Sequence, residues 1–522
     1  MFGQIKKILF LNLLLLIVAS PVYSNIVAIS AGNGHSLALD SDGTVWSWGK
    51  NDYGQLGDGS VSYRTYPAKV FSEDGLGYLE DIIDVSAGGS FSIAIDIDGF
   101  AYAWGRNDFG QLANGTTDTC FFPTSILDSS GINELSNIYE IAAGAFHCIA
   151  SDRDSSVWVW GCNREGALGI GTSDLSPHSL PVRPIDTLTG VFLQDVVDVS
   201  AGALFNLAVL SDGTVMAWGA NGDGQLGSDT TLNQVYPTLI LNESGDGFLN
   251  NIIEVSACGS GVFDIYGHSL AIKSDNTLRA WGRNYNGQCG DGTNMVRWRP
   301  VTVVDEWGTD SFENVISIKA STEHSLALKA YSSVYAWGNN YFGVLGNGST
   351  IDSYIPTRVH GEGCSGYLGH IVEISSSQTH NLALDSDGTV WAWGRNNYGQ
   401  LGDGSMEQRN CPVRVLGLPV QIDEIAIIKP DKPALFAYPN PFNSMVRIAI
   451  DAPLETNQKI EIYDLTGRRV KIISKEIVIR SETTGQVHEI IWAPASSITS
   501  GVYLIRAHLN GQLITKRVVY IK

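Results

Sequence analysis

Short runs of alternating apolar and polar residues make up most of the chain, and turn-forming residues separate them. Alternation with a period of two is typical of β-strands, because successive strand side chains point to opposite faces of a sheet. The first two runs are 26–31 and 35–39. The pair Asp42-Gly43 then predicts a tight hairpin into a third run, 44–48. A fourth run, 67–70, begins with Pro67, which favours an edge strand.

This unit recurs seven times, and a Trp-Gly pair marks each copy at steps of 56, 56, 58, 63, 56 and 56 residues. The seven tryptophans are Trp48, Trp104, Trp160, Trp218, Trp281, Trp337 and Trp393. Repeats of this length bury their faces against one another rather than alone. Four antiparallel strands in each of seven copies predict an all-β, seven-bladed propeller closed by its two chain ends.

Histidine stands thirteen residues before the repeat tryptophan in five copies, and phenylalanine fills that slot in the other two. The histidines are His35, His147, His268, His324 and His380. One residue per blade is spread around the ring, so we expect a packed histidine bonded to nearby backbone and not a metal ligand. Asn51 recurs in every copy while its acidic neighbours do not, which favours turn formation over calcium binding.

The amino-terminal residues 1–24 have the layout of a secretory signal peptide: Lys6 and Lys7, an apolar stretch from Ile8 to Val18, and the small residue Ser24. The alternative is a membrane anchor, but this stretch is shorter than the ~20 residues that span a bilayer. We expect no transmembrane segment in the mature chain.

The chain contains seven cysteines, an odd number, and none of them forms a Cys-x-x-Cys pair. Most are expected to be small buried hydrophobes, with one or two disulfides as the alternative.

Charge differs between the two ends of the chain. Residues 25–428 carry 18 Lys and Arg against 46 Asp and Glu, a net of −28, whereas residues 429–522 carry 13 against 8, a net of +5. Phosphate backbones bind Lys and Arg, so the long acidic region should be repelled by nucleic acid. The composition excludes a nucleic-acid-binding role and also suits a soluble secreted protein.

Three motifs of the first copy, HSLAL at 35–39, TVW at 44–46 and GQLG at 54–57, return in the last copy as HNLAL, TVW and GQLG. They resemble the repeat of the regulator of chromosome condensation family over residues 25–428. The resemblance implies a seven-bladed propeller. The chromatin and nucleotide-exchange roles of that family are not expected here, because the region is acidic and an exported chain would not meet a nuclear GTPase.

A second module, residues 435–522, follows a charged, proline-containing linker at 429–434. It resembles the type A sorting domain of type IX secretion substrates, a small β-sandwich of some Gram-negative bacteria; an immunoglobulin-like stalk is the alternative. Its motif residues are Pro439, Asn440, Pro441, Phe442, Asn443, Gly467, Gly501 and Tyr503. The resemblance implies contact with the secretion machinery, cleavage at the linker, and a mature protein that is secreted or attached to the outer surface.

The sequence contains no catalytic or cofactor-binding motif. We therefore expect a non-catalytic scaffold that binds a protein or glycan at the cell surface, with a glycan-processing enzyme or a structural surface-layer component as alternatives. The fifth copy carries an insertion between its first two strands, on the face shared with the loop between its third and fourth strands. The candidate partner-binding residues there are Phe263, Asp264, Tyr266, Arg297, Trp298 and Arg299. Aromatic residues in comparable loops of other copies bind partners too or, alternatively, cover the rim between blades.

Overall fold

The computed structural model divides the chain into two compact units, residues 1–421 and 422–522. It describes residues 25–187, 189–258 and 267–419 of the first unit. In the second unit it describes 434–438, 446–451, 460–464, 468–473, 478–482, 485–492, 494, 498–499, 501–509 and 512–520. The predicted signal peptide lies outside these ranges, as does the predicted linker except for its last residue, Ala434.

The first unit contains seven four-stranded antiparallel sheets, each formed by four consecutive strands. Blades one to three are β1 (Ile26–Ala31), β2 (His35–Asp40), β3 (Val45–Gly49) and β4 (Arg64–Lys69); β5 (Ile82–Ala87), β6 (Phe91–Asp96), β7 (Ala101–Gly105) and β8 (Cys120–Ser125); β9 (Ile138–Ala143), β10 (His147–Asp152), β11 (Val157–Cys162) and β12 (Pro177–Val182). Blades four and five are β13 (Val196–Ala201), β14 (Phe205–Leu210), β15 (Val215–Gly219) and β16 (Gln234–Leu239); β17 (Ile252–Ala257), β18 (His268–Lys273), β19 (Leu278–Gly282) and β20 (Arg297–Thr302). Blades six and seven are β21 (Val315–Ala320), β22 (His324–Lys329), β23 (Val334–Gly338) and β24 (Ser353–Arg358); β25 (Ile371–Ser376), β26 (His380–Asp385), β27 (Val390–Gly394) and β28 (Arg409–Arg414).

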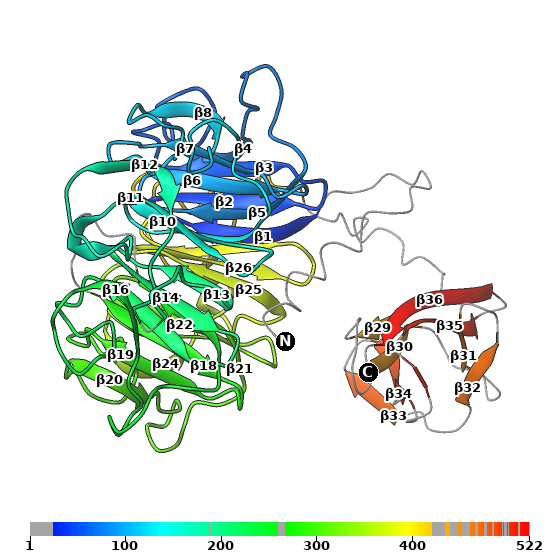
Figure 1. Ribbon diagram of the computed structural model, residues 1–522. Coiled ribbons are helices and arrows are strands. Elements are labelled where there is room, and N and C mark those ends of the chain that lie inside the picture. Colours follow the sequence, from blue (N-terminus) through cyan, green and yellow to red (C-terminus); the bar gives the residue numbers. More distant parts are fainter. Residues whose placement is uncertain are drawn as a thin grey trace. The chain divides into compact units, whose positions relative to one another are not determined.

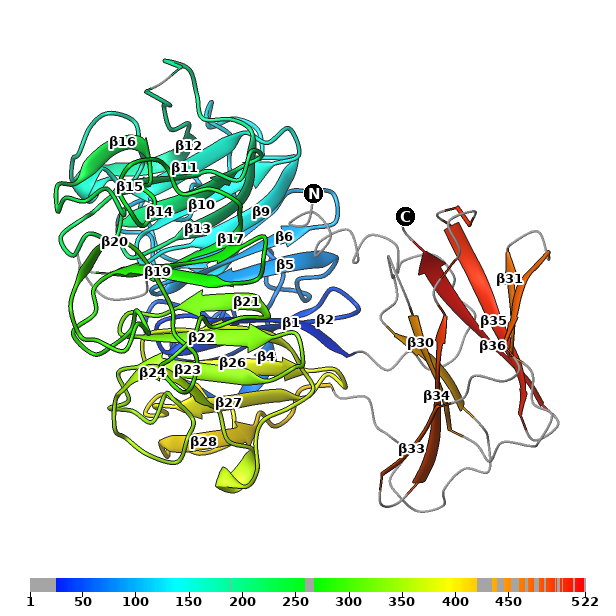
Figure 2. The same cartoon turned by 90° about the horizontal axis from the view of Figure 1, so that it is seen from below.

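The predicted seven-bladed propeller is confirmed (Figure 1). The first strands of neighbouring blades contact one another and surround the axis, while the fourth strands form the outer rim. Strands of the first blade, in blue, lie beside those of the seventh, in yellow (Figure 2). The described helical structure consists of two single 3-10 turns, Arg164–Gly166 and Glu362–Cys364.

The start predicted for the fourth strand is wrong, because β4 begins at Arg64 and not at Pro67. Its pairing with β3 skips register between Ser47 and Gly49. Pro67 lies at this irregularity, where its missing N–H removes no ladder bond.

The repeat tryptophans join each blade to the one before it. All seven are fully buried. The indole Nε1 of Trp104, for example, donates a 2.9 Å hydrogen bond to the carbonyl of Gln55 in the first blade. The core of the propeller therefore lies between its blades, as expected for copies that cannot bury their faces alone.

The repeat histidines also link blades, through side chains as well as through the nearby backbone groups predicted. His35 Nε2 lies 3.0 Å from Ser92 Oγ of the second blade. His147 Nε2 lies 2.9 Å from Asn206 Oδ1 of the fourth blade. Burial lowers the pKa of His35 to about 3 and that of His147 to about 4. These histidines are neutral parts of the core.

Two cysteines form a disulfide, Cys364–Cys411, which agrees with the alternative given for the cysteines. Cys364 belongs to the connection after the sixth blade, and Cys411 to the outer strand of the seventh. Four other thiols, Cys148, Cys162, Cys258 and Cys289, are buried as predicted.

The second unit contains two four-stranded antiparallel sheets. One comprises β29 (Ala434–Tyr438), β30 (Val446–Asp451), β34 (Gly485–Trp492) and β33 (Val478–Glu482). The other comprises β32 (Arg469–Ile473), β31 (Ile460–Asp464), β35 (Gly501–Leu509) and β36 (Gln512–Tyr520). The rings of Trp492 and Tyr503 meet edge to face at 5.5 Å, which packs one sheet against the other.

Candidate binding face

The loops after the first and third strands of each blade emerge at the same end of the blade, as predicted. In the first blade, the amide of Lys50 donates to the carbonyl of Gly34 at 2.8 Å and so ties one loop to the other. We call this end of the propeller the loop face. The inserted segment of the fifth blade lies between β17 and β18 in the sequence, and Phe263, Asp264 and Tyr266 lie outside the described residues.

The other three candidates do not lie in a loop, so their predicted placement between the third and fourth strands is wrong. Arg297, Trp298 and Arg299 are the first residues of the outer strand β20, and Arg297 pairs with Gly282 of β19. The pairing of β20 with β19 begins at Arg297, three residues before the repeat proline Pro300. The three side chains therefore sit on the rim of the propeller.

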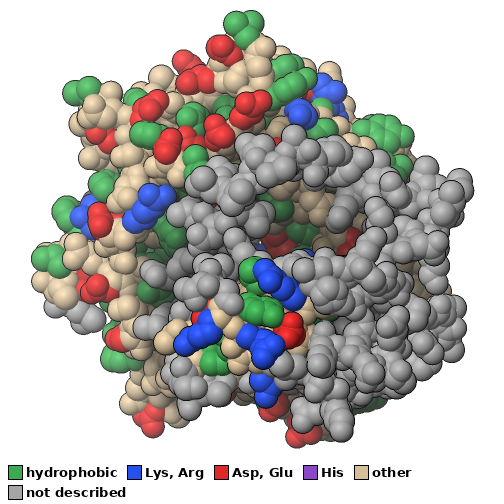
Figure 3. Space-filling view, turned by 90° about the vertical axis from the view of Figure 1, so that its right-hand side faces the viewer, with side chains coloured by type: hydrophobic (Ala, Val, Ile, Leu, Met, Phe, Trp, Pro, Cys, Tyr) green, Lys and Arg blue, Asp and Glu red, His purple; other side chains and the backbone are tan. Residues whose placement is uncertain are grey.

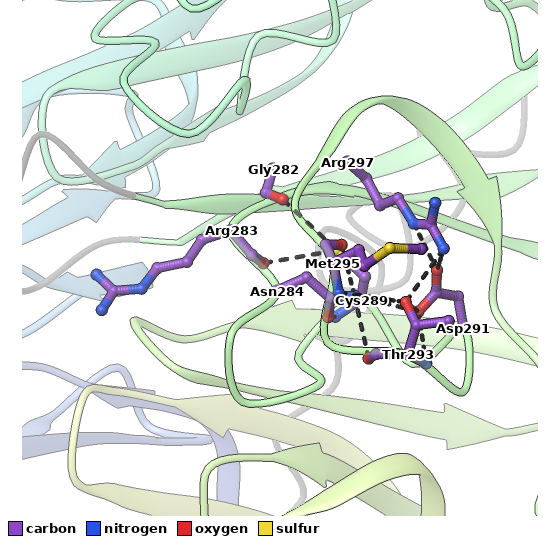
Figure 4. Close-up of polar contacts among 8 residues, drawn as sticks. All are labelled: Gly282, Arg283, Asn284, Cys289, Asp291, Thr293, Met295 and Arg297. Atoms are coloured by element: carbon purple, nitrogen blue, oxygen red, sulfur yellow. Dashed lines mark hydrogen bonds and ion pairs between the residues drawn. The ribbon is translucent and has the colours of Figure 1, made fainter.

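Arg297 holds the preceding loop in shape (Figure 4). It forms an ion pair with Asp291 and donates from Nη2 to Thr293 Oγ1 at 3.1 Å. The first and seventh blades repeat the pair, as Arg64–Asp58 and Arg409–Asp403. This arginine is a repeated structural element.

Trp298 and Arg299 bridge the fourth and fifth blades. A Cβ placed on Gly224 would lie 2.6 Å from Trp298 Cδ1, so the indole needs a glycine beneath it. Arg299 Nη1 donates to the carbonyl of Ser244 at 2.7 Å, and its Nε lies 3.3 Å from Asp229. The alternative that rim aromatics cover the gap between blades is the one that the structure supports.

Sequence reasoning missed a second set of aromatic residues, on the loop face itself. Cations stand two residues after the repeat tryptophan in four blades, and aromatic rings stand five residues after it in four. The cations are Lys50, Arg106, Arg283 and Arg395, and the rings are Tyr53, Phe109, Phe342 and Tyr398. We call the contacts that these residues make across blades the stacking arc.

One part of the stacking arc runs from the sixth blade to the first. The guanidinium of Arg395 lies 4.9 Å from the ring centroid of Phe342 and 6.0 Å from that of Tyr398. Lys50 Nζ lies 5.3 Å from the Tyr398 centroid on the other side. Tyr63 meets Tyr398 edge to face at 5.1 Å. These cation–aromatic contacts fix the side chains without removing them from solvent, because all five are partly exposed or exposed.

The other part joins the first three blades. Arg106 lies 4.9 Å from the Tyr53 centroid and 5.2 Å from that of the buried Phe146. Phe109 packs against Phe146 at 5.3 Å. Flat, half-exposed rings and guanidinium groups that are already held in place lose little conformational entropy on binding.

Carboxylates neutralise part of the arc. Lys50 pairs with Asp52 at 3.1 Å and Arg106 with Asp108 at 2.6 Å. Arg395 forms no ion pair with any residue that the structure describes. On the side shown in Figure 3, the coloured acidic side chains are dispersed among polar and apolar ones. Arg395 is therefore the point of the loop face most suited to an anionic group.

A ring of carboxylates occupies the third position of five first strands around the axis. Its members are Asp84, Glu140, Asp198, Glu254 and Glu373. The amide of Val255 donates to Asp198 Oδ2 at 2.8 Å, and that of Ile318 to Glu254 Oε1 at 3.2 Å. These bonds join neighbouring blades. Burial, then repulsion from Glu140 and Glu254, raises the pKa of Asp198 well above its usual range. The ring therefore has a structural role between blades.

No group of three or more His, Cys, Asp or Glu suited to a metal ion occurs among the described residues. The same part of the chain has no helix long and apolar enough to cross a membrane.

Family comparisons agree with this architecture. Residues 12–263 match the RCC1-like domain, and 332–384 and 387–427 match the regulator of chromosome condensation (RCC1) repeat. The chain belongs to the RCC1 family. Residues 437–522 match the secretion system C-terminal sorting domain, so this RCC1 protein carries a type IX export signal.

Relatives of this RCC1 chain have varied roles. The ultraviolet-B receptor UVR8 of Arabidopsis thaliana is 31% identical over 396 residues, which cover 76% of this chain and 82% of the receptor. The E3 ubiquitin-protein ligase HERC2 of Homo sapiens is 28% identical over 317 residues, or 60% of this chain and 6% of the ligase.

Solved RCC1-type structures share the fold. Human WBSCR16 has a TM-score of 0.58 at 20% identity and covers 72% of this chain and 94% of its own. Prp20p of Saccharomyces cerevisiae, described with its binding to Gsp1p and histones, has a TM-score of 0.57 at 21% identity and covers 73% and 88%. At this identity the likeness shows the fold alone.

Proposed function

We propose that this RCC1 propeller is a non-catalytic binding scaffold that acts on a protein or glycan at the outer surface of a Gram-negative bacterium. The stacking arc is the observation that carries the proposal. It presents Phe342, Tyr398 and Arg395 partly exposed and fixed by mutual contacts. Aromatic residues and arginine are enriched among the residues that dominate binding energy at interfaces.

The inserted segment with Phe263, Asp264 and Tyr266 stays part of the proposed surface, because it connects two strands at the loop face. Trp298, which is 48% exposed, adds a ring at the adjoining rim. Arg297 and Arg299 act in this proposal by supporting that rim. The sorting domain brings the propeller to the compartment where its partner would be found. Whether the mature protein is released or stays attached does not change which face it presents.

The test compares binding of the full chain without its signal peptide, residues 25–522, to intact cells that lack the gene. Replacing Phe342 and Arg395 by Ala should weaken binding at least tenfold. Lys69→Ala is the matched control, because Lys69 stacks on Trp46 and Tyr78 at 5.4 and 5.2 Å at the opposite end of the first blade. Equal binding by both variants, each with an unchanged melting temperature, would contradict the proposal.

Enzymatic treatment of the same cells before the binding measurement shows whether the partner is a protein or a glycan. Treatment with a protease should remove binding to a protein partner, whereas treatment with glycosidases should remove binding to a glycan. Release of reducing sugars from surface polysaccharide by the purified chain would instead favour the enzyme alternative.

A further inference from the structure

A groove of about 700 Å³ opens on the outer rim beside the third blade. Trp158, Leu180, Arg183 and Phe192 line it on the third blade, and Ser129 lines it from the connection that follows the second. The lining is mostly apolar around one arginine. Ligand sites commonly have this size and this mixture of many apolar groups and few polar ones.

The groove occurs where the third repeat departs from the others. In three blades an aromatic side chain on the fourth strand covers glycine turns of the preceding blade: Tyr66 lies over Gly404, Phe122 over Gly59 and Gly75, and Tyr236 over Gly171. Leu180 takes this position in the third blade and reaches only Gly131. The segment leading to it is also two residues longer than in the other copies. The groove therefore accompanies an aliphatic side chain at this position and the longer segment, which is particular to the third copy.

Arg183 is held in place without an acceptor. Its guanidinium lies 5.5 Å from the ring centroid of Trp158 and 4.9 Å from that of Phe192. The indole of Trp158 is itself fixed by a 3.0 Å hydrogen bond to Asp152 Oδ2. Nε and Nη2 of Arg183 are buried and make no hydrogen bond in the structure. Buried N–H groups without an acceptor are costly, and a guanidinium fork matches a carboxylate.

Two similar stacks elsewhere in the propeller have an acidic partner. Arg414, stacked on Trp391 at 5.1 Å, lies 3.9 Å from Glu362. Lys329, stacked on Phe312 at 4.1 Å, lies 4.0 Å from Glu306. Arg183 has no such ion pair among the described residues. Lys69 and Arg358 also stack on rings without an ion pair among these residues, but Arg183 differs from them because two of its guanidinium nitrogens are buried without a hydrogen bond.

We propose that this groove binds a short segment of a partner protein in which an aromatic residue adjoins an Asp or Glu. The carboxylate meets the guanidinium fork of Arg183, and the aromatic ring fills the space over Leu180. A peptide fits better than an enclosed small molecule because the groove is open along the outer strand β12. This site is separate from the stacking arc and does not rest on the function proposed for it.

Fluorescence anisotropy with the full chain, residues 25–522, tests the proposal. The probe is a fluorescein-labelled hexapeptide Gly-Ser-Phe-Asp-Ser-Gly, and the comparison peptides replace Phe by Ala or Asp by Asn. The parent peptide should bind, and each replacement should weaken binding at least tenfold. Arg183→Gln should abolish binding, while Arg414→Gln in the seventh blade should leave it unchanged. Leu180→Phe should fill the groove and block the peptide.

Several results would overturn the proposal. One is no saturable binding of the parent peptide, and another is equal binding by the Arg183→Gln variant. Binding of free phenylacetate at Arg183 without binding of the peptide would assign the groove to a small carboxylate instead. If Leu180→Phe does not fold, the binding measured for Arg183→Gln tests the proposal by itself. The melting temperature of Arg183→Gln is measured to show that this variant is folded.

Discussion

The indole Nε1 of Trp48 donates a 2.9 Å hydrogen bond to the backbone carbonyl of Gln400, which joins the first blade to the seventh. Ser36 Oγ donates to the same carbonyl at 3.0 Å and lies 2.8 Å from Nε2 of His380. The sixth blade repeats this arrangement, where Trp337 and Ser325 both donate to Gln288 at 2.8 Å. The seam of the ring is therefore an ordinary blade interface, and the described strands of both blades at the seam are consecutive in the sequence.

Trp48→Phe should lower the free energy of unfolding by about 1–2 kcal/mol, because a buried carbonyl loses one of its two donors. Trp337→Phe is the matched control and should cost about the same. Urea unfolding measures both. A much smaller cost at Trp48 than at Trp337 would mean that the ring is not closed at this seam in solution.

Acid should destabilise the propeller through its buried histidines. Burial lowers the pKa of all five to about 3 or 4. Above pH 6.5 they are neutral in both states and contribute no pH dependence. Below pH 6.5 the unfolded chain takes up protons that the folded chain does not, so the free energy of unfolding falls. Each histidine adds at most about 1.4 kcal/mol per pH unit.

His35→Phe tests this contribution, because phenylalanine fills the same slot in the second and fourth blades as Phe91 and Phe205. Between pH 6.5 and 4, its unfolding free energy should depend less steeply on pH than that of the parent. An unchanged slope would show that His35 is not the acid-sensitive group.

Local chemistry made the propeller predictable. Alternating strands, the Asp42-Gly43 hairpin and the returning Trp-Gly pair each act within a few residues, so they can be read along the chain. The start of β4 could not be read, because it depends on pairing with β3 at an irregular register.

The candidate sites were less predictable because their partners come from different repeats. Arg395 is stacked on Phe342, which lies 53 residues earlier in the sequence. Only the arrangement of blades shows that contact. The sequence does not show that Arg297 forms an ion pair with Asp291, because that pair depends on how the loop folds back on β20. The groove beside Leu180 left one signal in the sequence, the two extra residues of the third copy.

Asp198→Asn should stabilise the folded chain at pH 7. Burial and neighbouring carboxylates raise the pKa of Asp198, so its ionised form opposes folding at neutral pH. At low pH the carboxyl group of Asp198 is protonated and does not oppose folding. As the pH rises, the unfolded chain gives up this proton more readily than the folded chain, so the folded chain loses stability. The gain in melting temperature should therefore shrink on acidification and disappear below about pH 4.

Asp212→Asn provides the control of opposite sign. The Thr214 hydroxyl lowers the pKa of this exposed carboxylate, which favours its ionised form in the folded chain. The substitution should lower stability slightly at pH 7. A stabilising effect of similar size at both positions would point to net charge rather than to the buried environment of Asp198.

The sorting domain should be required for export and removed afterwards. Mass spectrometry of the surface or secreted protein should find a chain that starts near Asn25 and ends within 429–434, since a linker is accessible to proteolysis. Deletion of 435–522 should leave the propeller inside the cell. Recovery of mature protein that still ends at Lys522 would contradict removal of the domain.

Reduction should destabilise the propeller through Cys364–Cys411. The two cysteines are 47 residues apart, and closing a loop of this length in the unfolded chain is worth about 4 kcal/mol in the chain-entropy description. Thermal unfolding with and without dithiothreitol measures the effect. The double variant Cys364→Ser, Cys411→Ser should melt like the reduced parent and should not respond to the reductant. If the double variant still responds, another thiol pair forms in solution, and Cys120, which is only partly buried, is the residue to replace next.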